Sequence, residues 1–290
     1  MKTMTRAGLA VVMAVAVAGC GEANSDGQPK PAARPSVQPA PGDHTLRLDV
    51  GGVEREVLLH APPAYRPGGP VPLVVVLHGR PSTPAEVRES SRMSETADAE
   101  GFLVAYPKGV NGGWRTRVGA PEADDLTFMR ALVDQLVQTW SVDPARVYAA
   151  GFSNGAAMTY RLGAEASDVF SAVAPVSGQF DDGGGEAPTA PAAPVSVISF
   201  MGNLDRGVAG ISLGRHRWHA MADCTPAEPE WADDSRRVSR IAAKCADGSE
   251  VVDYTVNDMG HEWPGPGNPT TAPDANALIW QFFAAHPRRA

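Results

Sequence analysis

Residues 146–162 read RVYAAGFSNGAAMTYRL, a short apolar run followed by a glycine-flanked serine and a helical stretch. Arg146–Ala150 is typical of a buried strand, and Asn154–Leu162 has helical character. The residues between them, Gly151-Phe152-Ser153-Asn154-Gly155, match the G-x-S-x-G pattern of a sharp strand-to-helix turn. The flanking glycines remove Cβ atoms that would clash in such a turn, so that a serine hydroxyl can project from the sheet edge. The stretch therefore predicts Ser153 as a nucleophile.

Strand-like and helical segments alternate on both sides of this turn. The dipeptide Gly51-Gly52 between the first two strand-like runs indicates a hairpin. The alternation predicts an α/β fold, with a mostly parallel sheet and helices on both faces. The predicted strands are Thr45–Val50, Val53–His60, Leu73–Leu77, Phe102–Tyr106, Ser171–Val176, Val195–Phe200 and Glu250–Val256, and the other predicted helices are Pro84–Glu100, Leu126–Trp140 and Asp274–Ala285.

A serine hydroxyl needs a base, and the base needs a carboxylate to orient it. In α/β folds with a G-x-S-x-G turn, the carboxylate and the histidine both follow the serine in the chain, the carboxylate first. His261 lies in the loop after the last predicted strand and is the predicted base. Asp205 follows the strand Val195–Phe200 and is the predicted acid. The rival carboxylates are Asp258, Asp223 and Asp233.

The negative charge that develops on the ester oxygen requires preorganised N–H donors. The backbone of Asn154, directly after the serine, is one predicted donor. The second is expected from the loop after Leu73–Leu77, where the Arg80 amide is favoured and Gly79 is the alternative. His78 in the same loop is expected to be structural.

Four segments together resemble the polyhydroxybutyrate-depolymerase-like esterases and the related feruloyl and acetylxylan esterases of carbohydrate esterase family 1. The resemblance implies an α/β-hydrolase fold. It also implies a metal-free, cofactor-free serine esterase for short acyl, hydroxyacyl or aromatic acyl esters. The segments are Leu77-His78-Gly79, Asp124-Asp125-Leu126-Thr127-Phe128, Gly151–Gly155 with Met158, and Gly260-His261-Glu262-Trp263-Pro264-Gly265.

The sequence departs from the family pattern at two places. The acid loop reads Met201-Gly202-Asn203-Leu204-Asp205 and continues into Arg206-Gly207-Val208-Ala209-Gly210. The predicted oxyanion loop contains Arg80-Pro81-Ser82 in place of a glycine-rich run, which is expected to alter the acyl pocket.

Several further side chains have a functional and a structural interpretation. Trp263, two residues from His261, is predicted to line the substrate pocket, and Trp114 is predicted either to do so or to pack in the core. Asp124 and Asp125 are expected to cap or brace a helix start. His216 and His219 have a zinc-like spacing but no obvious third ligand, so no metal is expected.

The stretch between Val176 and Val195 is too short and too polar for a lid. It holds only eighteen residues, rich in Gly, Pro, Ala and acidic side chains. Many hydrolases insert their lid at this point. An open cleft is therefore predicted, suited to chain ends or side groups of polymers.

The N-terminal residues are expected to export the chain. Lys2 and Arg6 precede the apolar stretch Gly8–Gly19, which spans only about 18 Å as a helix, short of a bilayer core of roughly 30 Å. The stretch ends in Val17-Ala18-Gly19-Cys20, which resembles a bacterial lipobox. We therefore expect a signal peptide over 1–19, a lipidated Cys20 with a proline-rich tether over 20–42, and a catalytic domain over 43–290.

Cysteine content agrees with export, and the charge content argues against a nucleic-acid partner; the chain is expected to be a monomer. With Cys20 lipidated, Cys224 and Cys245 remain and are expected to form a disulfide, the alternative being two free thiols. The net charge of −8, without a long basic run, argues against a nucleic-acid partner. The expected partners are an ester substrate and, through Cys20, a membrane.

The leading functional hypothesis is an extracytoplasmic serine carboxylic-ester hydrolase that forms an acyl-enzyme. One alternative is a surface-tethered binding module that has kept the fold and lost catalysis. Another is a peptidase or thioesterase that uses the same three residues.

Overall fold

The computed structural model describes residues 37–118, 124–180, 190–265 and 273–288. These residues belong to one compact unit, Val37–Ala290. The predicted signal peptide, Cys20 and most of the predicted tether lie outside the described residues. Among the helices that are described, none is long and apolar enough to cross a membrane.

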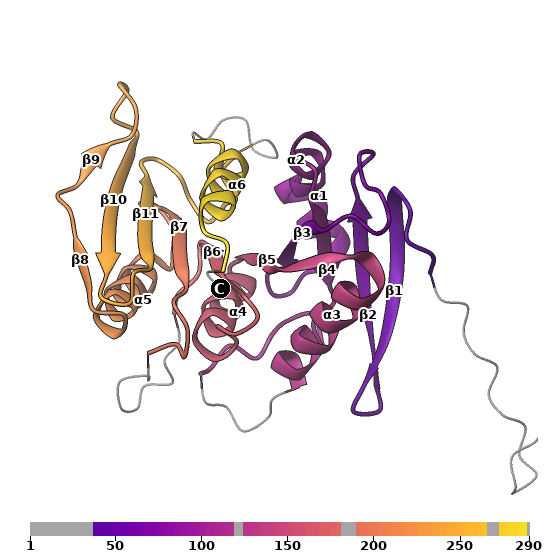
Figure 1. Cartoon of the computed structure of the whole chain (residues 1–290). Helices are drawn as coiled ribbons and strands as arrows, with labels where there is room; N and C mark the ends of the chain where they lie inside the picture. The colour runs from indigo at the N-terminus through magenta and orange to yellow at the C-terminus, as the bar shows by residue number, and fades with distance from the viewer. Residues whose placement is uncertain (1–36, 119–123, 181–189, 266–272, 289–290) are drawn as a thin grey trace, which may run out of the picture. The chain divides into compact units, whose positions relative to one another are not determined.

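A single sheet runs through the unit (Figure 1), and its central strands are parallel. The spatial order is β1-β2-β4-β3-β5-β6-β7-β11-β10-β8, and β9 pairs with β10. Strands from β4 to β11 in this order pair in parallel, whereas β1, β2, β8, β9 and β10 pair antiparallel. The strands are β1 (Gly42–Val50), β2 (Val53–Ala61), β3 (Val71–Leu77), β4 (Leu103–Pro107), β5 (Val142–Phe152), β6 (Ala172–Val176), β7 (Ser196–Gly202), β8 (Cys224–Pro226), β9 (Glu230–Trp231), β10 (Val238–Cys245) and β11 (Glu250–Val256).

In the described part of the chain, three helices cover each face of the sheet. In Figure 1, α1 (Pro84–Ser91), α2 (Met93–Glu100) and α6 (Ala275–Ala285) lie on one face. The other face carries α3 (Asp124–Trp140), α4 (Asn154–Glu165) and α5 (Val208–Met221).

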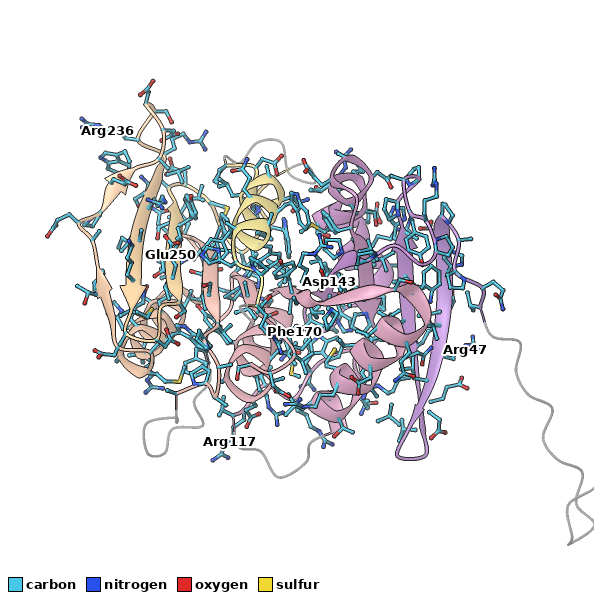
Figure 2. The ribbon with its side chains drawn as sticks, in the orientation of Figure 1. Arg47, Arg117, Asp143, Phe170, Arg236 and Glu250 are labelled. Carbon is cyan, nitrogen blue, oxygen red and sulfur yellow. A yellow bond between two sulfur atoms is a disulfide. The ribbon has the colours of Figure 1, made fainter. Side chains whose placement is uncertain are left out.

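The strand β3 contributes side chains to the hydrophobic clusters on both faces of the sheet. Leu73, Val75 and Leu77 belong to the cluster under α3, α4 and α5, whereas Val74 and Val76 belong to the cluster under α1, α2 and α6. Successive side chains of a strand point to opposite faces, so a strand covered on both sides is apolar throughout. Phe170 is one of the fully buried side chains on the α4 side (Figure 2).

The predicted α/β-hydrolase architecture with a mostly parallel sheet is confirmed, with three differences. The strands β8, β9 and β10, which extend one end of the sheet, were not predicted. The predicted helix Pro84–Glu100 is two helices, because Arg92 adopts a left-handed conformation (φ 52°) that ends α1. The helix α5 was not predicted. Its buried positions Ile211, Gly214, Arg215 and Trp218 include a glycine and an arginine, so no apolar stripe marks them in the sequence.

A disulfide joins Cys224 of β8 to Cys245 of β10, as predicted. The two residues are direct partners in the antiparallel pairing of these strands. The bond therefore ties the outermost strand of this edge to its neighbour.

Candidate active site

Ser153 lies at the turn between β5 and α4, as its sequence context predicts. Its backbone has φ 56° and ψ −115°, a strained conformation for a residue with a Cβ atom. The Ser153 N–H donates to the carbonyl of Val176 (3.0 Å). This bond fixes the turn against the end of the neighbouring strand β6.

The two flanking glycines are required by close backbone approaches. A Cβ atom on Gly151 would lie 2.4 Å from the carbonyl oxygen of Gly155. A Cβ atom on Gly155 would lie 2.3 Å from the carbonyl oxygen of Leu77 in β3. The glycines thus let α4 start directly against the sheet, which brings Ser153 to the sheet edge.

His261 and Asp205 form a hydrogen-bonded pair beside this turn. The His261 Nδ1 lies 2.8 Å from the Asp205 Oδ2, and the Asp205 Oδ1 accepts a hydrogen bond from the Gly207 N–H (2.7 Å). The Asp205 side chain is fully buried, whereas that of His261 is 23% exposed. Because an ionised carboxylate only accepts, Nδ1 is the donor and Nε2 is left as the proton acceptor.

The loops after β7 and β11 hold each other in place. The N–H of Leu204 donates to the carbonyl of Met259 (3.0 Å), and the N–H of Asp258 donates to the side chain of Asn203 (2.8 Å). The Ser177 hydroxyl donates to the carbonyl of Glu262, which fastens the histidine loop to the end of β6. These bonds position His261 through three neighbouring strands.

The rival carboxylates have other roles or positions. Asp258 and Asp223 are exposed. The Asp233 carboxylate accepts hydrogen bonds from the backbone of Arg237 and Val238 in its own turn. The structure pairs His261 with Asp205.

Two cavities meet at Ser153 and His261. One, of about 280 Å³, extends toward Gln179 and Ile211. The other, of about 270 Å³, extends toward Arg80 and Ser82. Ser153, Arg206 and His261 line both of them. An ester bound at Ser153 therefore has space on either side of its reacting carbon.

The residues of both predicted backbone donors lie near Ser153. Asn154 is the first residue of α4, where backbone N–H groups have no acceptor within the helix. Its side chain accepts from the Trp114 N–H (2.7 Å) and donates to the Trp114 carbonyl (3.2 Å), which fixes the residue. The loop that holds Arg80 passes close by, since a Cβ atom on Gly79 would lie 3.5 Å from the Ser153 Cβ.

The structure places both predicted substrate-binding tryptophans in the core. Trp263 is 4% exposed and donates from its indole nitrogen to the buried Asn276 of α6 (2.9 Å). Trp114 is also 4% exposed and donates to the carbonyl of His78 (2.9 Å). Both indoles satisfy their N–H inside the protein. The expectation that Trp263 forms the pocket wall is corrected to a packing role, and for Trp114 the structure agrees with the packing alternative.

His78 and Asp125 are structural, as expected. His78 donates from Nδ1 to the Gly79 carbonyl (2.7 Å) and accepts from the Gly109 N–H at Nε2 (3.0 Å). Burial lowers the pKa of His78. Asp125 accepts from the side chain of Arg55 (2.7 Å) and braces the backbone of Arg115 (3.0 Å).

The histidines with zinc-like spacing contact other partners. The His216 ring bonds to the carbonyl of Ser212, and the His219 ring bonds to the carboxylate of Asp253 (2.8 Å). In the described part of the chain, no three His, Cys, Asp or Glu side chains are arranged to hold a metal ion.

Some residues that line the site were missed in the sequence. Arg206 directly follows Asp205 and lines both cavities, and its signal was the departure from the family pattern. Phe152 packs its ring 4.8 Å from that of His261. Ile211 lies on α5, the helix that lacked a sequence signal. The predicted open cleft depends partly on residues 181–189, which lie outside the described residues.

Comparison with known proteins identifies the family. The family model described as "Esterase PHB depolymerase" matches residues 58–209, just over half of the chain. The chain belongs to this esterase family. It is a serine-type carboxylic ester hydrolase, as the resemblance of its motifs implied.

Two relatives and one solved structure illustrate the similarity. NocK of Nocardia uniformis subsp. tsuyamanensis, a protein named as an esterase, is 33% identical over 315 aligned positions that cover 90% of each chain. Feruloyl esterase B of Piromyces equi is 26% identical over 232 positions, which cover 71% of this chain and 42% of that protein. The acetyl xylan esterase from Aspergillus awamori has the same fold, with a TM-score of 0.62 and 14% identity over 83% of this chain and 99% of that one.

Proposed function

We propose that this esterase acts through the triad Ser153, His261 and Asp205 and forms an acyl-enzyme. The observation that carries the proposal is the 2.8 Å contact between buried Asp205 and His261, whose ring shares two cavities with Ser153. Nucleophile, base and orienting carboxylate are the three parts that such chemistry needs.

The reaction would proceed in two transfers. The Ser153 hydroxyl attacks the ester carbonyl, and His261 takes the hydroxyl proton at Nε2. The oxyanion is held by the backbone N–H groups of Asn154 and Arg80. His261 then donates its proton to the departing alcohol and leaves an acyl ester on Ser153. Water, activated by His261, releases the acid and restores the serine. Asp205 holds the imidazole in the required tautomer and stabilises its cationic form.

The substrate class we propose is short acetyl, hydroxyacyl or feruloyl esters of polymeric or oligomeric compounds. The names of the relatives, which include feruloyl esterases and a poly(3-hydroxyalkanoate) depolymerase, support this range. Parallel assays with methyl ferulate, acetylated xylan and 3-hydroxybutyrate oligomers would separate the three classes. The substrate with the highest kcat/KM identifies the acyl group that the site prefers.

A fluorophosphonate probe tests the proposed nucleophile. The probe should label the wild type on the peptide that contains Ser153, and Ser153→Ala should lose both labelling and hydrolysis of p-nitrophenyl acetate. Ser90→Ala is the matched control, because Ser90 lines one of the same cavities and its hydroxyl donates to the carbonyl of Val87 in its own helix (3.4 Å).

The outcome also separates the alternatives. An unlabelled wild type of native stability would indicate a binding module of the same fold. Labelling without ester hydrolysis, together with cleavage of a peptide or thioester, would indicate a peptidase or thioesterase.

We further propose that the enzyme is exported and anchored to a membrane by lipid on Cys20. The proposal depends on the signal-like residues 1–19 and the lipobox-like Val17-Ala18-Gly19-Cys20. Mass spectrometry of the mature N-terminus should find a diacylglyceryl-modified Cys20. Cys20→Ala should release the activity from the membrane fraction, and the released domain is expected to be monomeric.

A further inference from the structure

Arg80 and Arg206 are exposed and line one cavity with Ser153, and they lie in the two loops where the sequence departs from the family pattern. Arg206 follows the acid Asp205 and lines both cavities. Arg80 comes from the loop after β3 and lines the second cavity with Ser153 and His261. Each departure thus introduces a guanidinium at the ester site.

The structure indicates the course of the Arg80 side chain. A Cβ atom on Gly113 would lie 2.6 Å from the Arg80 Cδ and 3.1 Å from the Asn154 Oδ1. The aliphatic part of Arg80 therefore lies across Gly113, next to the side chain of the residue that follows the nucleophile. A side chain on residue 113 would displace it.

Carboxylates near these two arginines are engaged elsewhere. Asp205 directs both oxygens away from solvent, to His261 and to the Gly207 N–H. Glu86 lines the second cavity, but it accepts from the Ser82 hydroxyl and the Thr83 N–H in the cap of α1, and these bonds lower its pKa. Among the described residues, no carboxylate forms an ion pair with Arg80 or Arg206.

We propose that the preferred ester carries a free carboxylate close to the scissile bond, which Arg206 and Arg80 bind. The proposal rests on the function proposed above. Guanidinium groups bind carboxylates with paired, charge-assisted hydrogen bonds, and a cationic rim attracts anions to the site. Half-esters of dicarboxylic acids present such a carboxylate on the acyl side. Esters of hydroxy acids with a free acid group present it on the alcohol side.

Matched substrate pairs test this inference. Ethyl hydrogen succinate and ethyl levulinate have nearly the same shape and differ in the charge on the acyl side. 4-Acetoxybenzoate and methyl 4-acetoxybenzoate differ in the charge on the alcohol side. We expect kcat/KM for the charged member of one pair to exceed that for its neutral partner by about tenfold, as for a partly exposed charge-assisted contact.

Substitution of each arginine shows how much it contributes to the preference for the charged ester. Arg206→Gln should remove most of this preference, Arg80→Gln a smaller part, and Arg206→Lys should keep some of it. Arg236→Gln is the matched control, because Arg236 is an exposed arginine in the turn between β9 and β10 (Figure 2). Raising the ionic strength from about 0.01 M to about 1 M should also weaken the preference, since it shortens the screening length roughly tenfold.

The outcomes separate the inference from the proposed function. A wild type that prefers the neutral member of both pairs would overturn the inference. So would Arg206→Gln if it lowered kcat/KM equally for both members, which is the result of a structural role. If Ser153→Ala still hydrolyses all four esters, the proposed nucleophile is wrong, whatever the charge preference.

Discussion

The carboxylate of Asp205 and the imidazole of His261 are 56 residues apart in the chain and lie 2.8 Å apart in the structure. Their contact is a consequence of sheet topology. β7 and β11 are parallel neighbours in register from Val197 and Val251 onward, so the loops after them emerge side by side. Parallel strands deliver their following loops to the same edge of the sheet, which is where ligands of open α/β folds bind.

Asp205→Asn should lower kcat by about three orders of magnitude with little change in KM. An asparagine can offer an N–H to the ring and so favour the imidazole tautomer that cannot accept the serine proton. Steady-state kinetics with p-nitrophenyl acetate measure the effect. Asp258 is an exposed residue three positions before His261, and the kcat of Asp258→Asn should stay within about twofold of the wild-type kcat. Comparable losses in the two variants would argue against the assignment of the acid.

Gly155→Ala should destabilise the fold by about 3 kcal/mol or more. The added methyl group would lie 2.3 Å from the Leu77 carbonyl, and neither α4 nor β3 can move without disturbing the core. Urea unfolding followed by tryptophan fluorescence gives the free energy of unfolding. Gly69→Ala is the control, because its Cβ would meet only the Arg66 carbonyl, at 3.6 Å, and it should change stability by less than about 1 kcal/mol. Similar values for the two variants would contradict the close-approach argument.

Trp263→Phe should cost stability rather than substrate affinity. The substitution leaves the buried Asn276 side chain without its indole donor, at a cost of about 1 to 3 kcal/mol. The kcat/KM for methyl ferulate, measured well below the unfolding temperature, should stay within about twofold of the wild type. A tenfold loss at unchanged stability would instead place Trp263 in contact with the substrate.

The free energy of unfolding should fall as the pH drops below about 6.5, because the unfolded chain then protonates His78. Burial lowers the pKa of the folded His78 from its ordinary value of 6.5, so the unfolded chain binds a proton that the folded chain does not. The contribution of neutral His78 to the free energy of unfolding is therefore complete above about pH 6.5 and declines as the pH falls below it. His78→Gln should destabilise the protein less, relative to the wild type, at pH 5.5 than at pH 7.5.

Val87→Ala is the control for the pH experiment. Val87 is buried and carries no titratable group, so Val87→Ala should lower the free energy of unfolding by the same amount at both pH values. Urea titrations of the three proteins at each pH give the comparison. A cost of His78→Gln that does not depend on pH would contradict the role of burial at His78.

Some elements were predictable because their signals are local. The turn around Ser153 could be predicted because Gly151 and Gly155 mark it within a few residues. Strands such as Leu73–Leu77 were predictable because burial on both faces requires a continuous apolar run. By contrast, α5 packs with Gly214 and Arg215 among its buried residues, where the arginine bonds to the carbonyl of Tyr254. Such a face has no apolar periodicity to detect.

The fold class, the turn that carries Ser153 and the family could all be inferred from the amino-acid sequence. These depend on local backbone sterics and on the alternation of strands and helices, which a linear pattern records. The three-dimensional arrangement was needed to select Asp205 over its rivals as the partner of His261, and to show that Trp263 faces the core and that Arg80 and Arg206 share one site. Distance along the chain does not specify which way a side chain points or which loops meet. Those relationships arise only when the order of strands in the sheet brings separate loops to one edge.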